Sequence, residues 1–179
     1  MSKVLVAIVG RPNVGKSSLF NRLVRSPVSV VTETAGTTRD RVSTEISYED
    51  YPLVLVDTGG LEATPETGIA EQVQEQVEIA IEAADAIILV TDVLYGCTPI
   101  DEVIAQRLRR AQKPIILAAN KADNQRRARD TSDFFRLGFG EAIPISAHHD
   151  LGIDSLMGEL LKVLPEQGEP LPRRRSHGT

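Results

Sequence analysis

The sequence is poor in cysteine and in aromatic residues. Among its 179 residues there is one cysteine, Cys97, and no tryptophan, and aromatic residues make up 4%. A single cysteine excludes an internal disulfide framework and a metal site built from several thiolates. The chain must therefore be stabilised by its hydrophobic core, which a chain of this length can form because it buries roughly 70% of its unfolded surface.

An excess of positive charge and a long apolar run are also missing. Lysine and arginine number 20 against 25 aspartate and glutamate, a net charge of −5, which excludes a nucleic-acid binder that relies on broad positive charge alone. No apolar run approaches the ~18 residues of a membrane span. The run Val4–Val9 is short for a secretion signal and is followed by Gly10-Arg11-Pro12 rather than by a cleavage site. We therefore expect a cytoplasmic protein without a membrane partner.

What the sequence does contain is an alternation of short apolar runs with amphipathic stretches. The runs predict strands at 4–9, 42–48, 53–56, 86–90, 115–119 and 143–145. Helical spacing predicts helices at 17–24, 73–84, 99–111, 130–137 and 153–164. This order predicts an α/β fold, a doubly wound and mostly parallel six-stranded sheet with helices on both faces and one antiparallel edge strand.

Two segments lack periodicity. Residues 26–41 are expected to form a loop, after which the strands at 42–48 and 53–56 pair as a hairpin through residues 49–52. From Pro165 the chain is rich in proline and has no apolar pattern. We therefore predict one folded domain over residues 1–165 and a flexible linker or tail over residues 166–179.

The strongest motif is G-x-x-x-x-G-K-[ST] at residues 10–17, between a predicted strand and a predicted helix, as this phosphate-binding motif requires. Backbone N–H groups turn inward around phosphate oxygens there, and the helix N-terminus favours negative charge. Lys16 is expected to bridge the β- and γ-phosphates, and the Ser17 hydroxyl to bind Mg²⁺. The predicted phosphate-binding residues are Gly10, Arg11, Pro12, Asn13, Val14, Gly15, Lys16, Ser17 and Ser18.

A second motif, Asp57-Thr58-Gly59-Gly60, follows the apolar run at 53–56. A carboxylate at this strand end can reach Mg²⁺ through water. The N–H of Gly60 can reach the γ-phosphate, and that contact exists only with a triphosphate, so it can act as a switch. Alone, D-x-x-G is a weak signal that an ordinary turn at a strand end would also explain.

Two further motifs are suited to reading a base. In Asn120-Lys121-Ala122-Asp123, the Asp123 carboxylate is placed to accept from guanine N1–H and the 2-amino group, which adenine cannot match. We expect Asn120 to hold the loops and the Lys121 stem to lie along the base. In Ser146-Ala147, the Ala147 N–H could donate to guanine O6. All four motifs follow successive strands, where open α/β sheets bind ligands, and they therefore predict GTP and GDP as ligands.

These strings resemble the TrmE–Era–EngA–Septin-like GTPase family. Residues 10–23, 36–41 and 57–61 are similar to the first G domain of the Der (EngA) ribosome-assembly GTPases, and the resemblance covers residues 3–165. It implies hydrolysis of GTP to GDP and phosphate, and a role in large-subunit assembly. The partners it implies are the large ribosomal subunit or its rRNA, through the full-length protein, and the other domains of that chain.

Members of the Der family carry two G domains and a C-terminal KH-like domain, whereas this chain stops after one G domain. The chain is then either an excised first domain or a single-domain relative, and we expect the excised domain because residues 165–179 lie where the linker between domains should begin. A TrmE-like G domain of tRNA modification is the disfavoured alternative, because there the motif lies in the middle of a longer chain and here it starts at residue 10.

The resemblance also suggests how hydrolysis is supported. It assigns Thr38, within residues 32–40, as a Mg²⁺ ligand beside Ser17 and Asp57. Position 61 is leucine, which cannot orient the attacking water as the glutamine of Ras-like enzymes does. The related proteins use an asparagine to coordinate K⁺, which here would be Asn13 with oxygens from Thr32, Thr34 and Thr37.

The expected enzyme is thus a slow, K⁺-stimulated GTPase whose catalytic set is Lys16, Thr38, Gly60 and Asn13. Two alternatives stay open. Asn13 could only brace the phosphate loop, and the domain could be a weakly hydrolysing regulatory module that binds GTP.

Overall fold

Apolar, largely β-branched runs form the centre of the fold. In this computed structural model, residues 4–25, 29–32, 43–60, 68–123 and 129–165 are described. One sheet has the strand order β2-β3-β4-β1-β5-β6-β7. Its strands are β1 (Val4–Val9), β2 (Ser29–Thr32), β3 (Ser43–Tyr48), β4 (Tyr51–Asp57), β5 (Ala86–Asp92), β6 (Ile115–Asn120) and β7 (Ile143–Pro144). The pairs β4–β1, β1–β5, β5–β6 and β6–β7 are parallel, whereas β3 runs antiparallel to both its neighbours.

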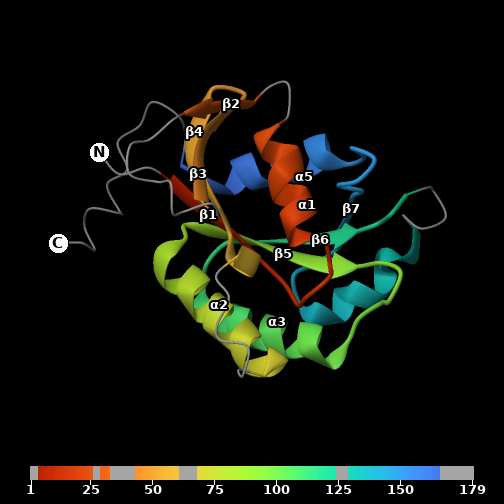
Figure 1. The fold of residues 1–179 in the computed structure, drawn as a ribbon. Helices are drawn as coiled ribbons and strands as arrows, with labels where there is room; N and C mark the ends of the chain where they lie inside the picture. The colour runs from red at the N-terminus through yellow and green to blue at the C-terminus, as the bar shows by residue number, and fades with distance from the viewer. Residues whose placement is uncertain (1–3, 26–28, 33–42, 61–67, 124–128, 166–179) are drawn as a thin grey trace.

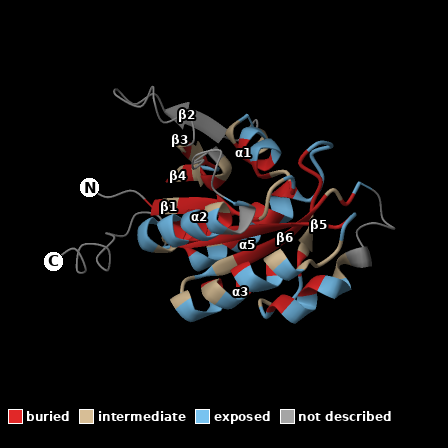
Figure 2. Cartoon of the chain, turned by 60° about the horizontal axis from the view of Figure 1, so that its bottom comes forward, coloured by how far each residue is buried: buried red, intermediate tan, exposed pale blue. Residues whose placement is uncertain are grey.

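Helices cover both faces of the sheet, as a doubly wound fold requires (Figure 1). The helices α1 (Lys16–Val24) and α5 (Ile153–Val163) pack on one face, and α2 (Ile69–Ala83) and α3 (Pro99–Ala111) on the other. Two 3₁₀ segments, η1 (Thr58–Gly60) and η2 (Arg129–Leu137), complete the described elements. Every residue of β5 is buried, so the sheet lies at the middle of the molecule (Figure 2).

The predicted doubly wound class is confirmed, but the sheet has seven strands rather than six. Part of the segment expected as a loop forms β2, whose sequence Ser-Val-Val-Thr is rich in β-branched residues and pairs with β3. β3 is therefore an inner strand, and β2 occupies the edge. The hairpin between β3 and β4 turns through Glu49 and Asp50, whose φ angles of 50° and 69° are those of a two-residue turn.

The segment expected as a helix at 130–137 is a 3₁₀ helix. The buried side chains of Phe134 and Leu137 are three residues apart, a spacing that places them on one side of a 3₁₀ helix as well as of an α-helix. The predicted tail at 166–179 lies outside the described residues. None of the described helices is both long enough and apolar enough to cross a membrane.

Candidate functional site

The phosphate loop joins β1 to α1 at the carboxyl edge of the sheet. Gly15 caps the helix with a φ of 98°, a left-handed conformation that glycine adopts without strain. A Cβ atom at Gly15 would also collide with the carboxamide of Asn120. This glycine therefore lets the turn form and lets a neighbouring loop approach it closely.

The Lys16 side chain folds back over this loop. Its Nζ donates to the carbonyl oxygens of Gly10 at 2.8 Å and Arg11 at 2.9 Å. Burial lowers the pKa of Lys16, while the nearby Asp57 carboxylate acts in the opposite direction. The ammonium group is thus desolvated and held by neutral oxygens, an arrangement in which an incoming phosphate would be a strong competitor.

Two oxygen-bearing side chains meet beside the ammonium group. Ser17 Oγ donates to Asp57 Oδ2 at 2.9 Å, and Asp57 Oδ1 accepts from the N–H of Gly59 at 2.9 Å. Thr58 anchors this turn, because its buried hydroxyl donates to the carbonyl of Ile8 at 2.7 Å. A hydroxyl and a carboxylate side by side are the hard oxygen donors that Mg²⁺ prefers, so the residues fit that ion.

Asn120, at the end of β6, joins two loops that are far apart in sequence. Its Nδ2 donates to the carbonyl of Val14 at 2.8 Å, and its Oδ1 accepts from the N–H of Ala147 at 3.0 Å. The Asn120 side chain is buried, so both bonds are shielded from water. Because the Ala147 N–H is already engaged, a base oxygen would have to share or replace its bond to Asn120.

Asp123 lies at the exposed end of the same segment. Its Oδ1 accepts from the hydroxyl of Ser146 at 2.8 Å, and that hydroxyl in turn accepts from the N–H of His149 at 3.1 Å. Ser146 is fully buried, whereas Asp123 is exposed. The buried serine thus fixes the direction of a carboxylate that remains open to a ligand.

Lys121 bridges the base-reading segment and the phosphate loop. Its Nζ donates to the carbonyl of Asn13 at 3.0 Å and to Asp92 Oδ2 at 2.9 Å. Asp92, the last residue of β5, is fully buried, and its Oδ1 accepts from the N–H of Leu94 at 2.8 Å. Sequence reasoning missed Asp92, although a carboxylate that follows the apolar run 86–90 by two residues is a signal that could have identified it.

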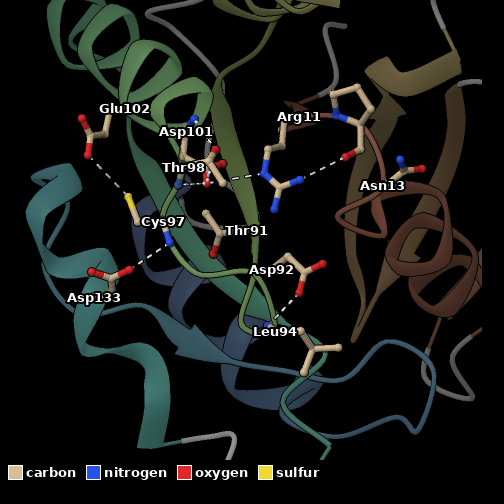
Figure 3. A network of polar contacts seen from close by, with 12 residues as sticks. Arg11, Asn13, Thr91, Asp92, Leu94, Cys97, Thr98, Asp101, Glu102 and Asp133 are labelled. Atoms are coloured by element: carbon tan, nitrogen blue, oxygen red, sulfur yellow. Dashed lines mark hydrogen bonds and ion pairs between the residues drawn. The ribbon is translucent and has the colours of Figure 1, made fainter.

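The Arg11 side chain points toward Thr98 and Asp101 at the start of α3 (Figure 3). Its Nε lies 3.6 Å from Asp101 Oδ2, and its guanidinium carbon lies 5.4 Å from the centre of the Tyr95 ring. Asp101 also accepts from the N–H and the hydroxyl of Thr98, which caps α3. Arg11 therefore braces the loop from the protein side, and any contact it makes to a nucleotide falls to its backbone.

The Asp101 carboxyl belongs to a buried and incompletely bonded cluster. Burial raises the pKa of Asp101, and the hydrogen bonds from Thr98 and the charge of Arg11 oppose that shift. Asp101 Oδ1, Arg11 Nε and Arg11 Nη2 are buried without a hydrogen-bond partner. Burial also raises the pKa of the nearby Cys97 to about 11, so the thiol stays protonated at neutral pH and is a poor nucleophile.

Several predicted residues cannot be placed. Thr34, Thr37 and Thr38 lie outside the described residues, and of Thr32 only the backbone, at the end of β2, is described. Asn13 is exposed, with a φ of 73°, and its carbonyl faces Lys121.

Within the described part of the chain, no group of three or more histidine, cysteine, aspartate or glutamate side chains could hold a metal ion.

A pocket of about 350 Å³ opens beside the phosphate loop. Its walls come from the loop and the start of α1, from the turn after β4, and from one face of α2. The residues that line it are Pro12, Asn13, Gly15, Lys16, Ser17, Ser18, Gly59, Gln72, Val73 and Gln76. Sequence reasoning identified the loop side of this pocket but not the side that α2 provides.

Comparison with known proteins places this geometry in a family. Residues 5–121 match the model of the 50S ribosome-binding GTPases. Curated relatives include GTPase Der of Caldanaerobacter subterraneus, 49% identical over 93% of this chain, and GTPase Der of Lachnospira eligens, 48% identical over 93% of it. The chain spans 38% of the length of these relatives. The resemblance to the Der family is therefore confirmed for a segment the size of one G domain.

Solved structures of similar fold include two of Era. Era in complex with MgGDPNP and nucleotides 1506–1542 of 16S ribosomal RNA is 33% identical with a TM-score of 0.70, over 96% of this chain and 60% of the other. Aquifex aeolicus Era Y63A bound to GDP·AlF₄⁻ is 35% identical with a TM-score of 0.69, over 95% and 60%. Both alignments cover nearly the whole chain, so the fold is shared.

Proposed function

Because this chain belongs to the family of 50S ribosome-binding GTPases, we propose that its strand-edge site binds GTP and hydrolyses it to GDP and phosphate. The observation that carries this proposal is the pair of bonds made by Asn120 to Val14 and Ala147, since they tie a phosphate loop to a base-reading loop. A turn that merely connected a strand to a helix would not need such a link. The proposed G domain occupies residues 1–165.

Each residue near the phosphates has a defined task. Lys16 transfers its two hydrogen bonds from loop carbonyls to the β- and γ-phosphates, and the N–H of Gly60 meets the γ-phosphate. Ser17 and Asp57 would hold Mg²⁺, with Thr38 as a further ligand proposed from the resemblance alone. When bound, Mg²⁺ neutralises charge on the β- and γ-phosphate oxygens.

At the other end of the nucleotide, selectivity for guanine rests on hydrogen bonding. Asp123, aimed by Ser146, accepts from guanine N1–H and the 2-amino group, while Ala147 N–H donates to O6. The Lys121 stem lies along the base, its ammonium anchored to Asn13 and Asp92. A site built in this way penalises adenine because its buried or oriented polar groups would be left unpaired.

Hydrolysis by this domain is proposed to be slow and stimulated by K⁺. Leu61 has no group that could orient water, so another source of positioning and charge is needed. Asn13, with oxygens from Thr32, Thr34 and Thr37, is the proposed K⁺ site. Its support is the exposed position of Asn13 on the wall of the phosphate pocket.

The cellular role proposed is that of the N-terminal G domain of a tandem GTPase in large-subunit assembly, in the cytoplasm. It is supported by the similarity to GTPase Der over one G-domain length. The large ribosomal subunit or its rRNA, met through the full-length protein, and the neighbouring domains of that protein are the proposed partners. In this role the nucleotide state of the domain reports to those neighbours.

The test is steady-state GTP hydrolysis by this chain at fixed Mg²⁺, with KCl exchanged for NaCl at equal ionic strength. Faster turnover in KCl is the expected result, and equal turnover in both salts would remove the K⁺ proposal. Tight GTP binding with negligible turnover in both salts would instead favour a regulatory GTP-binding module, the reading that Leu61 supports. Absence of GTP binding would overturn the site itself.

A further inference from the structure

Gln76 is a buried polar side chain that the site described above does not use. It lies on α2, is 6% exposed, and lines the pocket that Lys16, Ser17 and Gly59 also line. None of the hydrogen bonds found for the described residues involves its carboxamide, and Gln76 is not among the described residues with a further polar contact. Among the described residues its nitrogen and oxygen have no partner, and they reach the phosphate pocket rather than being fully buried.

The fold does not require a glutamine at this position. The packing of α2 against the sheet and α3 comes from apolar side chains, among them Val73, Val77 and Ala80, which are buried in one hydrophobic cluster. The nitrogen and oxygen of the Gln76 carboxamide are not among the buried polar atoms that lack a partner, so they reach the open space of the pocket, and an apolar side chain of similar size would serve the packing of α2 equally well. A residue that breaks a local packing rule in this way points to a functional role.

The geometry of α2 places this side chain at the phosphate pocket. Gln72 and Gln76 are four residues apart, so they lie on the same face of the helix, and both line the phosphate pocket. Gln74 lies on a different face and lines a separate groove between α2 and α3. The helix thus presents glutamines to two different environments, of which only one is shared with Lys16.

We propose that Gln76 is a catalytic residue whose carboxamide orients the water that attacks the γ-phosphate of GTP. A carboxamide oxygen can accept a hydrogen bond from the water while the NH₂ group donates to a phosphate oxygen, which is what Leu61 cannot do. The assignment rests on the proposed function, because it needs GTP in this pocket.

The chemical step itself leaves Gln76 unchanged. The water oxygen forms a bond to the γ-phosphorus as the bond from that phosphorus to the β,γ-bridging oxygen breaks. The electron pair of the broken bond stays on the bridging oxygen, which becomes a terminal oxygen of GDP, and the water protons leave with the released phosphate. Gln76 contributes orientation, whose loss slows the step without removing the nucleotide.

The test compares Gln76→Leu with Gln74→Leu, the same change on the other face of the same helix. The protein is loaded with GTP, and single-turnover hydrolysis is measured with the affinities for GDP and a non-hydrolysable GTP analogue. For Gln76→Leu we expect hydrolysis 10- to 100-fold slower, both affinities within about twofold, and a melting temperature equal to or above that of the wild type. Gln74→Leu should leave the rate unchanged.

The combination of slower hydrolysis with undiminished stability separates catalysis from a structural role. A Gln76→Leu rate within twofold of the wild type overturns the proposal, as does a rate loss matched by equal losses of nucleotide affinity and stability. Gln76→Met, which keeps an unbranched side chain, serves if the leucine variant does not fold.

The wild-type protein supplies a second readout and a check on the underlying site. If its turnover is too slow to follow, the affinity for GDP with aluminium fluoride replaces the rate. Gln76→Leu is expected to weaken that affinity at least tenfold while that for GDP alone is unchanged, and an equal effect on both overturns the proposal. A wild-type chain that binds no GTP contradicts the proposed function, whereas a wild-type chain that hydrolyses GTP alongside an equally active Gln76→Leu contradicts only the role of Gln76.

Discussion

The two ends of the candidate site are built from different interactions. The phosphate end gathers charged side chains with little access to water, including Lys16, Asp57, Arg11 and Asp101. At the base end the loops are joined by neutral groups, the carboxamide of Asn120 and the hydroxyl of Ser146, and by one ion pair, Lys121 with the buried Asp92, while Asp123 is an exposed carboxylate. Buried charges thus predominate at the phosphate end, whereas most of the contacts at the base end are hydrogen bonds of neutral groups.

This difference predicts which end of the site sets the affinity for nucleotides and which end sets the choice among them. Lys16 must exchange the carbonyls of Gly10 and Arg11 for phosphates, so the phosphate end changes partners when it binds. The bond from Ser146 to Asp123 can persist when a base arrives, so that part of the base end is already organised. Changes at the phosphate end should therefore lower affinity for every nucleotide, and changes at the base end should alter the choice among nucleotides.

The largest effect is expected from Lys16→Ala. It removes the buried ammonium group that the phosphates would meet, and truncating one partner of a buried charge pair costs about 4 kcal/mol, roughly a thousandfold in the dissociation constant. Fluorescent GTP and ATP analogues, titrated by anisotropy, should weaken together. Lys162→Ala, an exposed lysine on α5, is the control. Nearly unchanged GTP binding would contradict the phosphate-loop assignment.

A smaller effect, on stability, is expected from Asp101→Asn beneath the phosphate loop. The change leaves the buried guanidinium of Arg11 without its counter-charge, and breaking a buried pair in this way costs about 3 kcal/mol. Urea unfolding measures the loss. Adding Arg11→Met should recover part of the stability because it removes the unpaired charge.

Glu102→Gln, at the next position and bonded to Arg136 on the surface, is the matched control for Asp101→Asn. It should change the free energy of unfolding by less than about 1 kcal/mol. If Asp101→Asn costs no more than this surface change, the ion pair is not a brace for the loop.

At the base end, Asp123→Asn is expected to shift the ratio of the affinities for GDP and XDP toward XDP by about a hundredfold, which corresponds to a difference in binding free energy of about 2.7 kcal/mol. The amide can donate to the 2-oxo group of xanthine, whereas the carboxylate can only accept from the 2-amino group of guanine. Competition of GDP and XDP against a fluorescent nucleotide gives the ratio. Asp150→Asn, an exposed carboxylate in the adjacent loop, should leave it unchanged. Retained preference for guanine would contradict the base-reading role of Asp123.

Sequence reasoning succeeded where a pattern is local. The apolar runs located β1, β5 and β6, and helical spacing located α3, which spans the predicted residues 99–111. The short strand β2 was missed because four residues carry too little periodicity and its pairing with β3 is formed only in the tertiary structure.

In the candidate site, too, some residues could be predicted from local sequence patterns and others could not. The motif residues are contiguous in sequence, so the phosphate loop and the Asn120–Asp123 segment could be predicted. The supporting residues could not, because each acts across a long sequence separation. Arg11 meets Asp101, and Gln76 meets the phosphate pocket, only once α2 and α3 pack beside β1. A buried arginine or glutamine has no local pattern that distinguishes it from an exposed one.

The smallest effect sharpens the comparison, because it concerns a residue that connects the two ends. Arg22, in the last turn of α1, donates from Nε to the carbonyl of Ala147 at 2.9 Å and from Nη2 to that of His148 at 3.0 Å. The helix that begins at Lys16 therefore also holds the loop whose N–H is proposed to read guanine O6.

Arg22→Met should weaken GDP binding by about tenfold, about 1.4 kcal/mol, the scale of one or two hydrogen bonds. The affinity for IDP, which retains O6, should fall by the same factor. The affinity for 6-thio-GDP, whose sulfur is a weak acceptor, should fall by less. Arg25→Met, an exposed arginine just after the same helix, is the control. Equal losses for all three nucleotides would show that Arg22 supports the fold of the site in general, and a smaller loss for 6-thio-GDP would show that the phosphate helix positions the base-reading amide.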